Sequence, residues 1–94
     1  MEKEFAVSLQ ATQTVSMPRY FSLHTTACMP RQQVEKLIAE LRGDNKVKTI
    51  RAVSDPLEGK LLCEFEAPNR ETVEAFLTTH RMQPELVIRA EREW

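Results

Sequence analysis

Two histidines and two cysteines are the side chains of this sequence whose types could do chemistry. An imidazole can act as a general base or a metal ligand near neutral pH, and a thiolate can act as a nucleophile or a metal ligand. The sequence has no Cys-x-x-Cys pair, no His-Glu-x-x-His, no Gly-x-Ser-x-Gly and, with two glycines, no glycine-rich phosphate loop. A common type of hydrolase or nucleotide-binding enzyme is therefore not indicated.

The elements that must position these groups can be recognised from periodicity and from the prolines and glycines between them. Residues 19–25, 60–66 and 86–92 alternate side chains with a period of two, and residues 47–53 are rich in β-branched residues, which predicts four strands. Apolar residues recur at helical spacing between Pro30 and Gly43 and again between Asn69 and Pro84. Two helices are predicted there, with Asn69 as the N-cap of the second.

The order strand-helix-strand-strand-helix-strand favours a ferredoxin-like α+β fold. In it two right-handed crossover units interleave into a four-stranded antiparallel sheet with both helices on one face. We expect this domain to span residues 17–94 and residues 1–16 to form an N-terminal extension, with an alternation at Phe5, Val7 and Leu9 that could be an extra strand. Because the second sheet face is left uncovered, a homodimer is predicted.

Side-chain alternation leads to a hypothesis about His24. If Phe21 and Leu23 face the helices, His24 lies on the open sheet face. With the first and third strands taken as parallel neighbours, His24 is expected beside Glu64 and Glu66. Such a pairing suits a fragment of a metal site, a general base or an imidazole that is merely ion-paired.

His80 follows the apolar line of the second helix, where an imidazole can cap carbonyl groups and interact with the negative end of the helix dipole. We expect it at the opposite end of the sheet from His24, so that only two chains together could bring both to one ion. A transition-metal site, if present, is predicted at His24, with Glu64 as the helper from the same chain, other ligands from the partner chain, and His80 as the alternative centre.

The cysteines are predicted to be reduced thiols, because the start Met1-Glu2-Lys3-Glu4 lacks a basic region followed by an apolar run and so predicts a cytoplasmic protein without an export signal. Cys63 shares the parity of Leu61 and Phe65, which indicates a small buried side chain. Cys28 precedes the first helix, where it is better placed to react.

Charge and hydropathy exclude two classes of partner. The chain has 13 basic and 14 acidic residues, a formal net charge of −1, so no excess of positive charge attracts nucleic acid or an anionic membrane surface. Its apolar runs span only a few residues, whereas a membrane-spanning helix needs about 20. Neither nucleic acid nor a membrane is an expected partner.

Residues 53–69, Val-Ser-Asp-Pro-Leu-Glu-Gly-Lys-Leu-Leu-Cys-Glu-Phe-Glu-Ala-Pro-Asn, resemble the hairpin signature of a family of small ferredoxin-like domains of unknown function. In that family a strand ending Cys-x-x-Glu-Ala-Pro leads into the second helix. The segments 17–20 and 83–87 are also similar, so the resemblance covers residues 17–91. The chain departs from the family at Arg81-Met82-Gln83-Pro84, where a Gly-Pro-like turn is frequent, and residues 1–16 have no counterpart.

The resemblance implies a dimer and, because the family has nickel-binding members, a site for nickel or another divalent transition metal. Two hypotheses therefore remain open. The first is a dimeric metal-binding module without enzymatic activity. The second is a small dimeric enzyme or ligand binder that uses a cavity between sheet and helices, as dimeric α/β-barrel monooxygenases do. The sequence does not identify a substrate, a pathway or a physiological metal.

Overall fold

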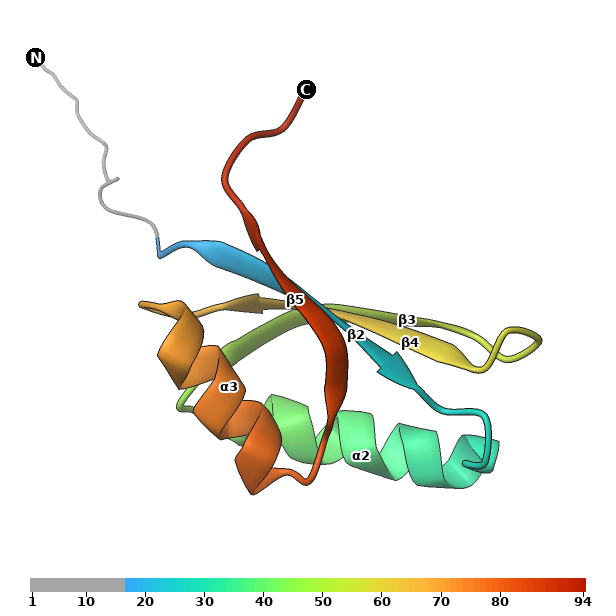
Figure 1. Cartoon of the computed structure of the whole chain (residues 1–94). Helices are drawn as coiled ribbons and strands as arrows, with labels where there is room; N and C mark the ends of the chain where they lie inside the picture. Colours follow the sequence, from blue (N-terminus) through green and yellow to red (C-terminus); the bar gives the residue numbers. More distant parts are fainter. Residues whose placement is uncertain (1–16) are drawn as a thin grey trace, which may run out of the picture.

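The computed structural model describes residues 17–94, and the predicted order of elements is confirmed (Figure 1). The candidate strand in residues 1–16 lies outside the described residues. The elements are β2 (Arg19–Thr25), α2 (Arg31–Gly43), β3 (Lys48–Asp55), β4 (Lys60–Glu66), α3 (Arg70–Thr79) and β5 (Pro84–Ala90). None of the helices in this part of the chain is long and apolar enough to cross a membrane.

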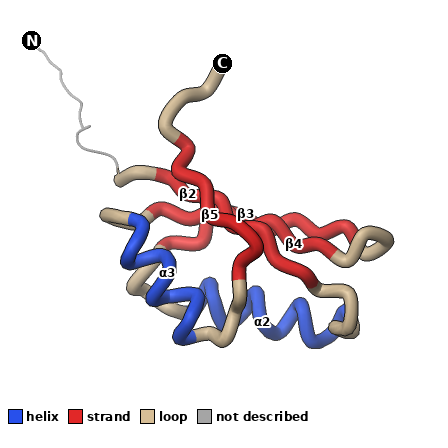
Figure 2. The backbone as a smooth tube through the Cα atoms, in the orientation of Figure 1, coloured by secondary structure: helices blue, strands red, loops and turns tan. Residues whose placement is uncertain are grey.

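The four strands form one sheet in the order β3-β4-β2-β5, and every neighbouring pair is antiparallel. Both helices lie on the same side of the sheet (Figure 2). This arrangement is the ferredoxin-like α+β fold that the sequence predicts. The assumption that the first and third strands run parallel is wrong, since β2 and β4 pair antiparallel.

Local signals explain where these elements begin and turn. Asn69 caps α3 as predicted, because its side chain accepts a hydrogen bond of 2.8 Å from the backbone N–H of Thr72. Gly59, in the turn between β3 and β4, has φ +66°, and a Cβ there would lie 2.9 Å from Cα of Ala27. The carbonyl of Gly59 accepts from the N–H of Thr26 at 2.7 Å, which ties the loop after β2 to the hairpin.

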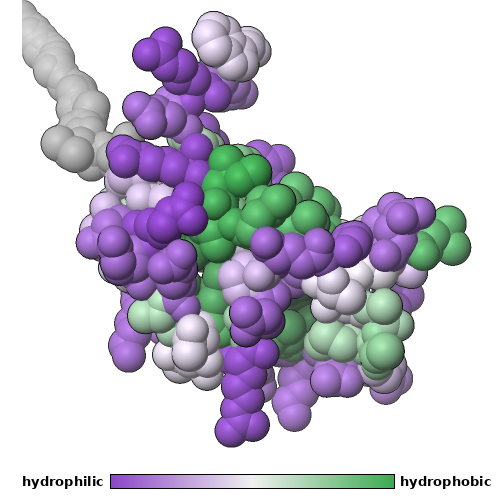
Figure 3. Space-filling view, viewed as in Figure 1, coloured by the Kyte–Doolittle hydropathy of each residue, from purple (hydrophilic) through white to green (hydrophobic). Residues whose placement is uncertain are grey.

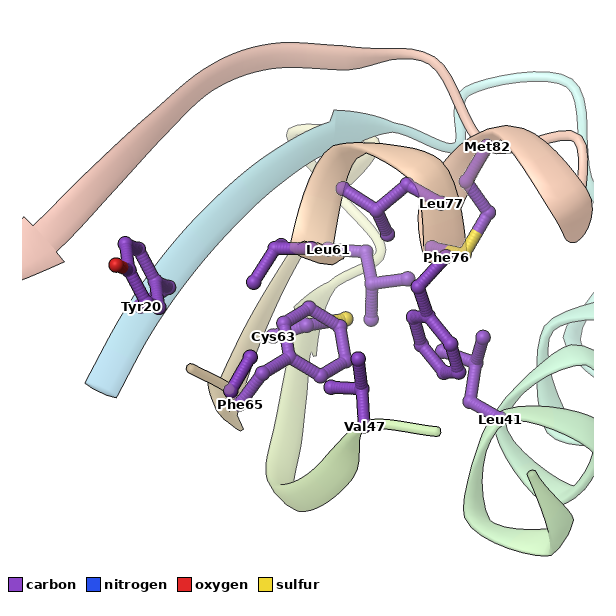
Figure 4. Close-up of a cluster of buried hydrophobic side chains, with 11 residues drawn as sticks. Tyr20, Leu41, Val47, Leu61, Cys63, Phe65, Phe76, Leu77 and Met82 are labelled. Atoms are coloured by element: carbon purple, nitrogen blue, oxygen red, sulfur yellow. The ribbon is translucent and has the colours of Figure 1, made fainter. Parts of the chain in front are cut away.

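The core lies between the sheet and the two helices (Figure 4). The rings of Phe65 on β4 and Phe76 on α3 meet edge to face, with centroids 5.5 Å apart. Leu61 and Cys63 lie on the same face of β4 and are buried, as their parity predicts. Further buried apolar side chains come from α2 and α3, with Val47 just before β3; they are Leu41, Val47, Val73 and Leu77.

Strand β2 faces the opposite way from the prediction. Its polar residues Ser22 and His24 are buried with exposed fractions of 0% and 4%, whereas Phe21 and Leu23 are only partly buried. The register explains why, because Ser22 is the direct cross-strand partner of Cys63 and such partners share a face. Once Cys63 faces the helices, Ser22 and His24 face them too, and Phe21 and Leu23 lie on the open face.

Candidate functional site

A cavity of about 640 Å³ brings the two histidines together. His24, at the end of β2, and His80, at the end of α3, both line it, and α2 forms a further wall. The prediction that they lie at opposite ends of the sheet is wrong. Because β2 and β4 are antiparallel and α3 runs back from the end of β4, the end of α3 returns to the end of β2.

A second hollow of about 680 Å³ lies between α2 and the β3–β4 hairpin. Although it is slightly larger, neither histidine is among the residues from the described part of the chain that line it. We therefore take the cavity beside His24 and His80 as the candidate site.

His24 is held by hydrogen bonds at both ring nitrogens. Its Nδ1 lies 3.3 Å from the carbonyl oxygen of Gln83, and its Nε2 lies 2.6 Å from Oγ of Ser22. A carbonyl can only accept, so Nδ1 donates, and Nε2 of the neutral ring accepts from the Ser22 hydroxyl. Burial lowers the pKa of His24 below its ordinary value, against the opposing influence of the Gln83 carbonyl and the charge of Glu85. His24 is thus favoured as a neutral imidazole.

Behind Ser22 lies Cys63, its direct cross-strand partner in the core. Burial raises the pKa of the Cys63 thiol to about 11, against the opposing influence of the Ser22 hydroxyl and the charge of Arg42. A thiol with this pKa stays protonated at neutral pH. Cys63 therefore serves packing rather than nucleophilic chemistry, while Cys28 is exposed.

His80 is the C-cap residue of α3, and its imidazole binds a carboxylate. Its Nε2 lies 2.8 Å from Oδ2 of Asp44, the C-cap residue of α2. The ring also meets Phe76 edge to face at a centroid distance of 4.8 Å. The backbone N–H of Lys46 and then the His80 imidazole lower the pKa of Asp44. Because a carboxylate can only accept, the bond is donated by Nε2 of His80.

Glu64 lies on the other face of the sheet. In the register of β2 and β4 it is opposite Phe21, whereas His24 is opposite Leu61, so the expected contact between His24 and Glu64 is wrong. Its side chain is 1% exposed and lies 3.0 Å from Nη1 of Arg19 and 2.6 Å from Nε of Arg51. Glu64 is thus the carboxylate of an ion-pair cluster on the open face.

The donor set does not fit the predicted metal centre. Among residues 17–94 no group of three or more His, Cys, Asp or Glu side chains is placed to hold an ion. Both nitrogens of His24 are already in hydrogen bonds, and one nitrogen of His80 binds Asp44. Whether the chain binds a metal stays a prediction, but His24 and Glu64 of one chain cannot form its centre.

Sequence reasoning missed several residues that shape this site. Asp44 precedes its partner His80 by 36 residues, so no local pattern links them. Lys36, Arg81 and Gln83 line the cavity from α2 and from the turn before β5. The sequence signal that could have singled out Arg81 was its position just after the end of the second predicted helix, where side chains are seldom part of the core.

Fold and cavity together define a ferredoxin-like α+β domain with a ligand-sized cavity at one end of its sheet. The sequence matches no protein-family model and no curated protein. Among solved structures it is similar to SCO4226 from Streptomyces coelicolor A3(2), with 16% identity, a TM-score of 0.70, and coverage of 81% of this chain and 99% of that one. It is also similar to protein YJCS, with 18% identity, a TM-score of 0.53, and coverage of 83% and 100%. These likenesses show the fold alone.

Proposed function

We propose that this protein is a homodimeric domain that binds a small organic ligand in the cavity beside His24 and His80. The observation that carries the proposal is the cavity itself. Its volume of about 640 Å³ falls within the roughly 300–1,000 Å³ of known ligand pockets. Apolar side chains, including Met29 and Leu37, line it together with the two imidazoles. An apolar wall with a few convergent polar groups is the usual composition of such pockets.

The open sheet face supports the dimer. Val53, Leu62, Leu23 and Leu86 are successive cross-strand partners, so they form one apolar row across β3, β4, β2 and β5. Leu62, Val53 and Leu86 are exposed by 36%, 53% and 43%. Figure 3 shows apolar side chains gathered over the middle of β5. A row of this extent favours a partner, and a second copy that presents the same row matches it by two-fold symmetry.

Light scattering at micromolar concentration tests the dimer. We expect about twice the chain mass of 10.9 kDa for the natural protein. Leu62→Glu, which places a charge at the centre of the apolar row, should give a monomer. Leu57→Glu is the matched control, because Leu57 is 96% exposed in the turn after β3 and should leave the dimer intact. A natural protein that is monomeric at every concentration contradicts the proposal, as does a dimeric Leu62→Glu variant.

Two measurements test the cavity as a ligand site. Native mass spectrometry of freshly purified protein should detect a co-purified organic molecule, and an NMR fragment screen should shift backbone signals of Met29, Leu37 and Met82, which line the cavity. Fragments that shift only signals outside the cavity would show that the site is elsewhere.

Nickel binding remains a separate prediction from the family resemblance. Two imidazoles facing one cavity favour it, but His24 would first have to give up a hydrogen bond to Ser22 or Gln83. Nickel and zinc titrations of the natural protein, His24→Ala and His80→Ala provide the test. If either variant binds the ion as tightly as the natural protein, that histidine is not a ligand. Binding should weaken below about pH 6, because a protonated imidazole cannot be a ligand.

A further inference from the structure

Arg81 stands in a backbone conformation that usually belongs to glycine. Its φ is 59°, in the left-handed region. The N–H of Arg81 donates to the carbonyl of Thr78 at 3.0 Å, and the N–H of Met82 donates to that of Leu77 at 2.8 Å. These two bonds form the Schellman ending of α3, whose left-handed position favours glycine because a Cβ is strained there. A residue other than glycine in a strained backbone conformation is often found at a functional site, which leads to the hypothesis that the Arg81 side chain binds something.

Arg81 is among the residues that line the cavity, and a second cationic residue, Lys36 on α2, lines it as well. Within residues 17–94 neither forms an ion pair with a carboxylate. Of the two carboxylates that line the cavity, Glu85 is neutralised by Lys60, whose Nζ lies 2.6 Å away. Glu40 is the other. With the charge of Glu85 offset by Lys60, the two cations Lys36 and Arg81 stand against the single carboxylate of Glu40. Among the described residues, the cavity wall therefore has an excess of positive charge.

The rest of the wall is apolar. Met29 and Leu37 are half-buried, Met82 is 7% exposed, and all three line the cavity. A hydrophilic anion such as phosphate alone would leave these side chains without a partner. A ligand with one anionic end and an apolar body would match both parts of the wall, because a guanidinium binds a carboxylate through two parallel hydrogen bonds.

We propose that the cavity binds a small organic acid, with its carboxylate held by Arg81 and Lys36 and its apolar body against Met29, Leu37 and Met82. This inference rests on the proposed function, since it names the ligand class of the same cavity. The side chain of Arg81 then has a reason to occupy a position where glycine would be less strained.

Binding of benzoate and of its neutral isostere benzamide, followed by NMR titration of the natural protein, tests the inference. We expect benzoate to shift signals of cavity residues and to bind at least tenfold more tightly than benzamide. Arg81→Gly and Lys36→Gln should each weaken benzoate at least tenfold and leave benzamide unchanged, while Arg81→Lys should retain part of the affinity. Arg70→Gln, an arginine of α3 that does not line the cavity, is the control and should bind benzoate normally.

Arg81→Gly has a second readout that separates function from folding. Because glycine suits the left-handed backbone, this variant should melt at an equal or higher temperature than the natural protein while losing benzoate. The ligand class is wrong if benzamide and benzoate bind the cavity equally well, or if Arg81→Gly and Lys36→Gln leave the affinity for benzoate unchanged. Either result would still leave the cavity as a binding site. If neither probe shifts a cavity residue, the proposed function falls together with the inference.

Discussion

The two faces of the sheet differ most at β2, and the difference reverses the usual distribution of polarity. The face toward the helices carries Ser22 and His24, both buried, whereas the open face carries Phe21 and Leu23. Hydrophobic burial alone would place the two apolar residues inside. The contrast indicates that each face is adapted to something other than simple packing.

On the inner face, the polar groups are tolerated because they are hydrogen-bonded to one another: the Ser22 hydroxyl donates to His24, and His24 donates to the Gln83 carbonyl. A buried polar group that lacks a partner is costly, but a satisfied network in a low dielectric is stable and holds its members rigidly. His24, between Ser22 and Gln83, also lines the cavity. The inner face therefore holds an imidazole in a fixed position at the cavity wall.

On the outer face, the apolar row continues across all four strands, and the buried Glu64 with Arg19 and Arg51 adjoins it. An apolar surface of this kind is stabilised when it is removed from water. These features support the proposals that the outer face serves dimer formation and the inner face ligand binding.

The largest expected difference between the faces is in stability. Phe65→Ala on the inner face should lower the free energy of unfolding by about 3–5 kcal/mol, because it empties a fully buried site against Phe76. Phe21→Ala on the outer face should lower it by only about 1 kcal/mol, because the ring is half-buried. Urea denaturation in the Leu62→Glu background, which separates folding from dimer formation, measures both. Equal losses would mean that the faces do not differ as described.

An intermediate effect is expected at Cys63. Cys63→Ala should cost about 1–2 kcal/mol, since it removes a small, fully buried group from the core. At pH 8 a thiol reagent should modify the exposed Cys28 quickly and Cys63 slowly, because a pKa of about 11 keeps Cys63 protonated and the core shields it. The Cys28→Ala protein isolates the slow reaction. Rapid modification of native Cys28→Ala would contradict the burial of Cys63.

The smallest expected effect is the pH dependence due to His24. Because its pKa is lowered in the folded protein, the unfolded chain binds the proton more readily. The stability from neutral His24 is therefore fully present above the unfolded value of about 6.5 and is lost as pH falls through the lower folded pKa. Denaturation from pH 7.5 to 5 should show a steeper loss for the natural protein than for His24→Gln.

In that comparison His80 is present in both proteins, so its contribution cancels. The pKa values of Asp44 and Glu85 are lowered below the ordinary values of these carboxyl groups, so both side chains stay charged between pH 7.5 and 5. An NMR titration of His24 with a midpoint at or above 6.5 would show that its environment is more polar than the described cavity.

Much of the fold could be predicted from local patterns, because periodicity and end signals act over a few residues. The Asn69 cap and the shared, buried face of Leu61, Cys63 and Phe65 on β4 are of this kind, and both occur where they were expected. Alternation alone, however, states only that Ser22 and His24 share a face opposite to Phe21 and Leu23. It does not state which face lies inside.

That choice was made by the pairing of β2 with β4, a contact between segments far apart in the chain. The antiparallel register sets Ser22 against Cys63, turns His24 inward and carries His80 to the same cavity. It also separates His24 from Glu64 by the thickness of the sheet. The sequence by itself determined the elements and their order, since these depend on neighbouring residues. Only the tertiary structure decided which histidine, carboxylate and arginine meet, because that depends on strand direction and register.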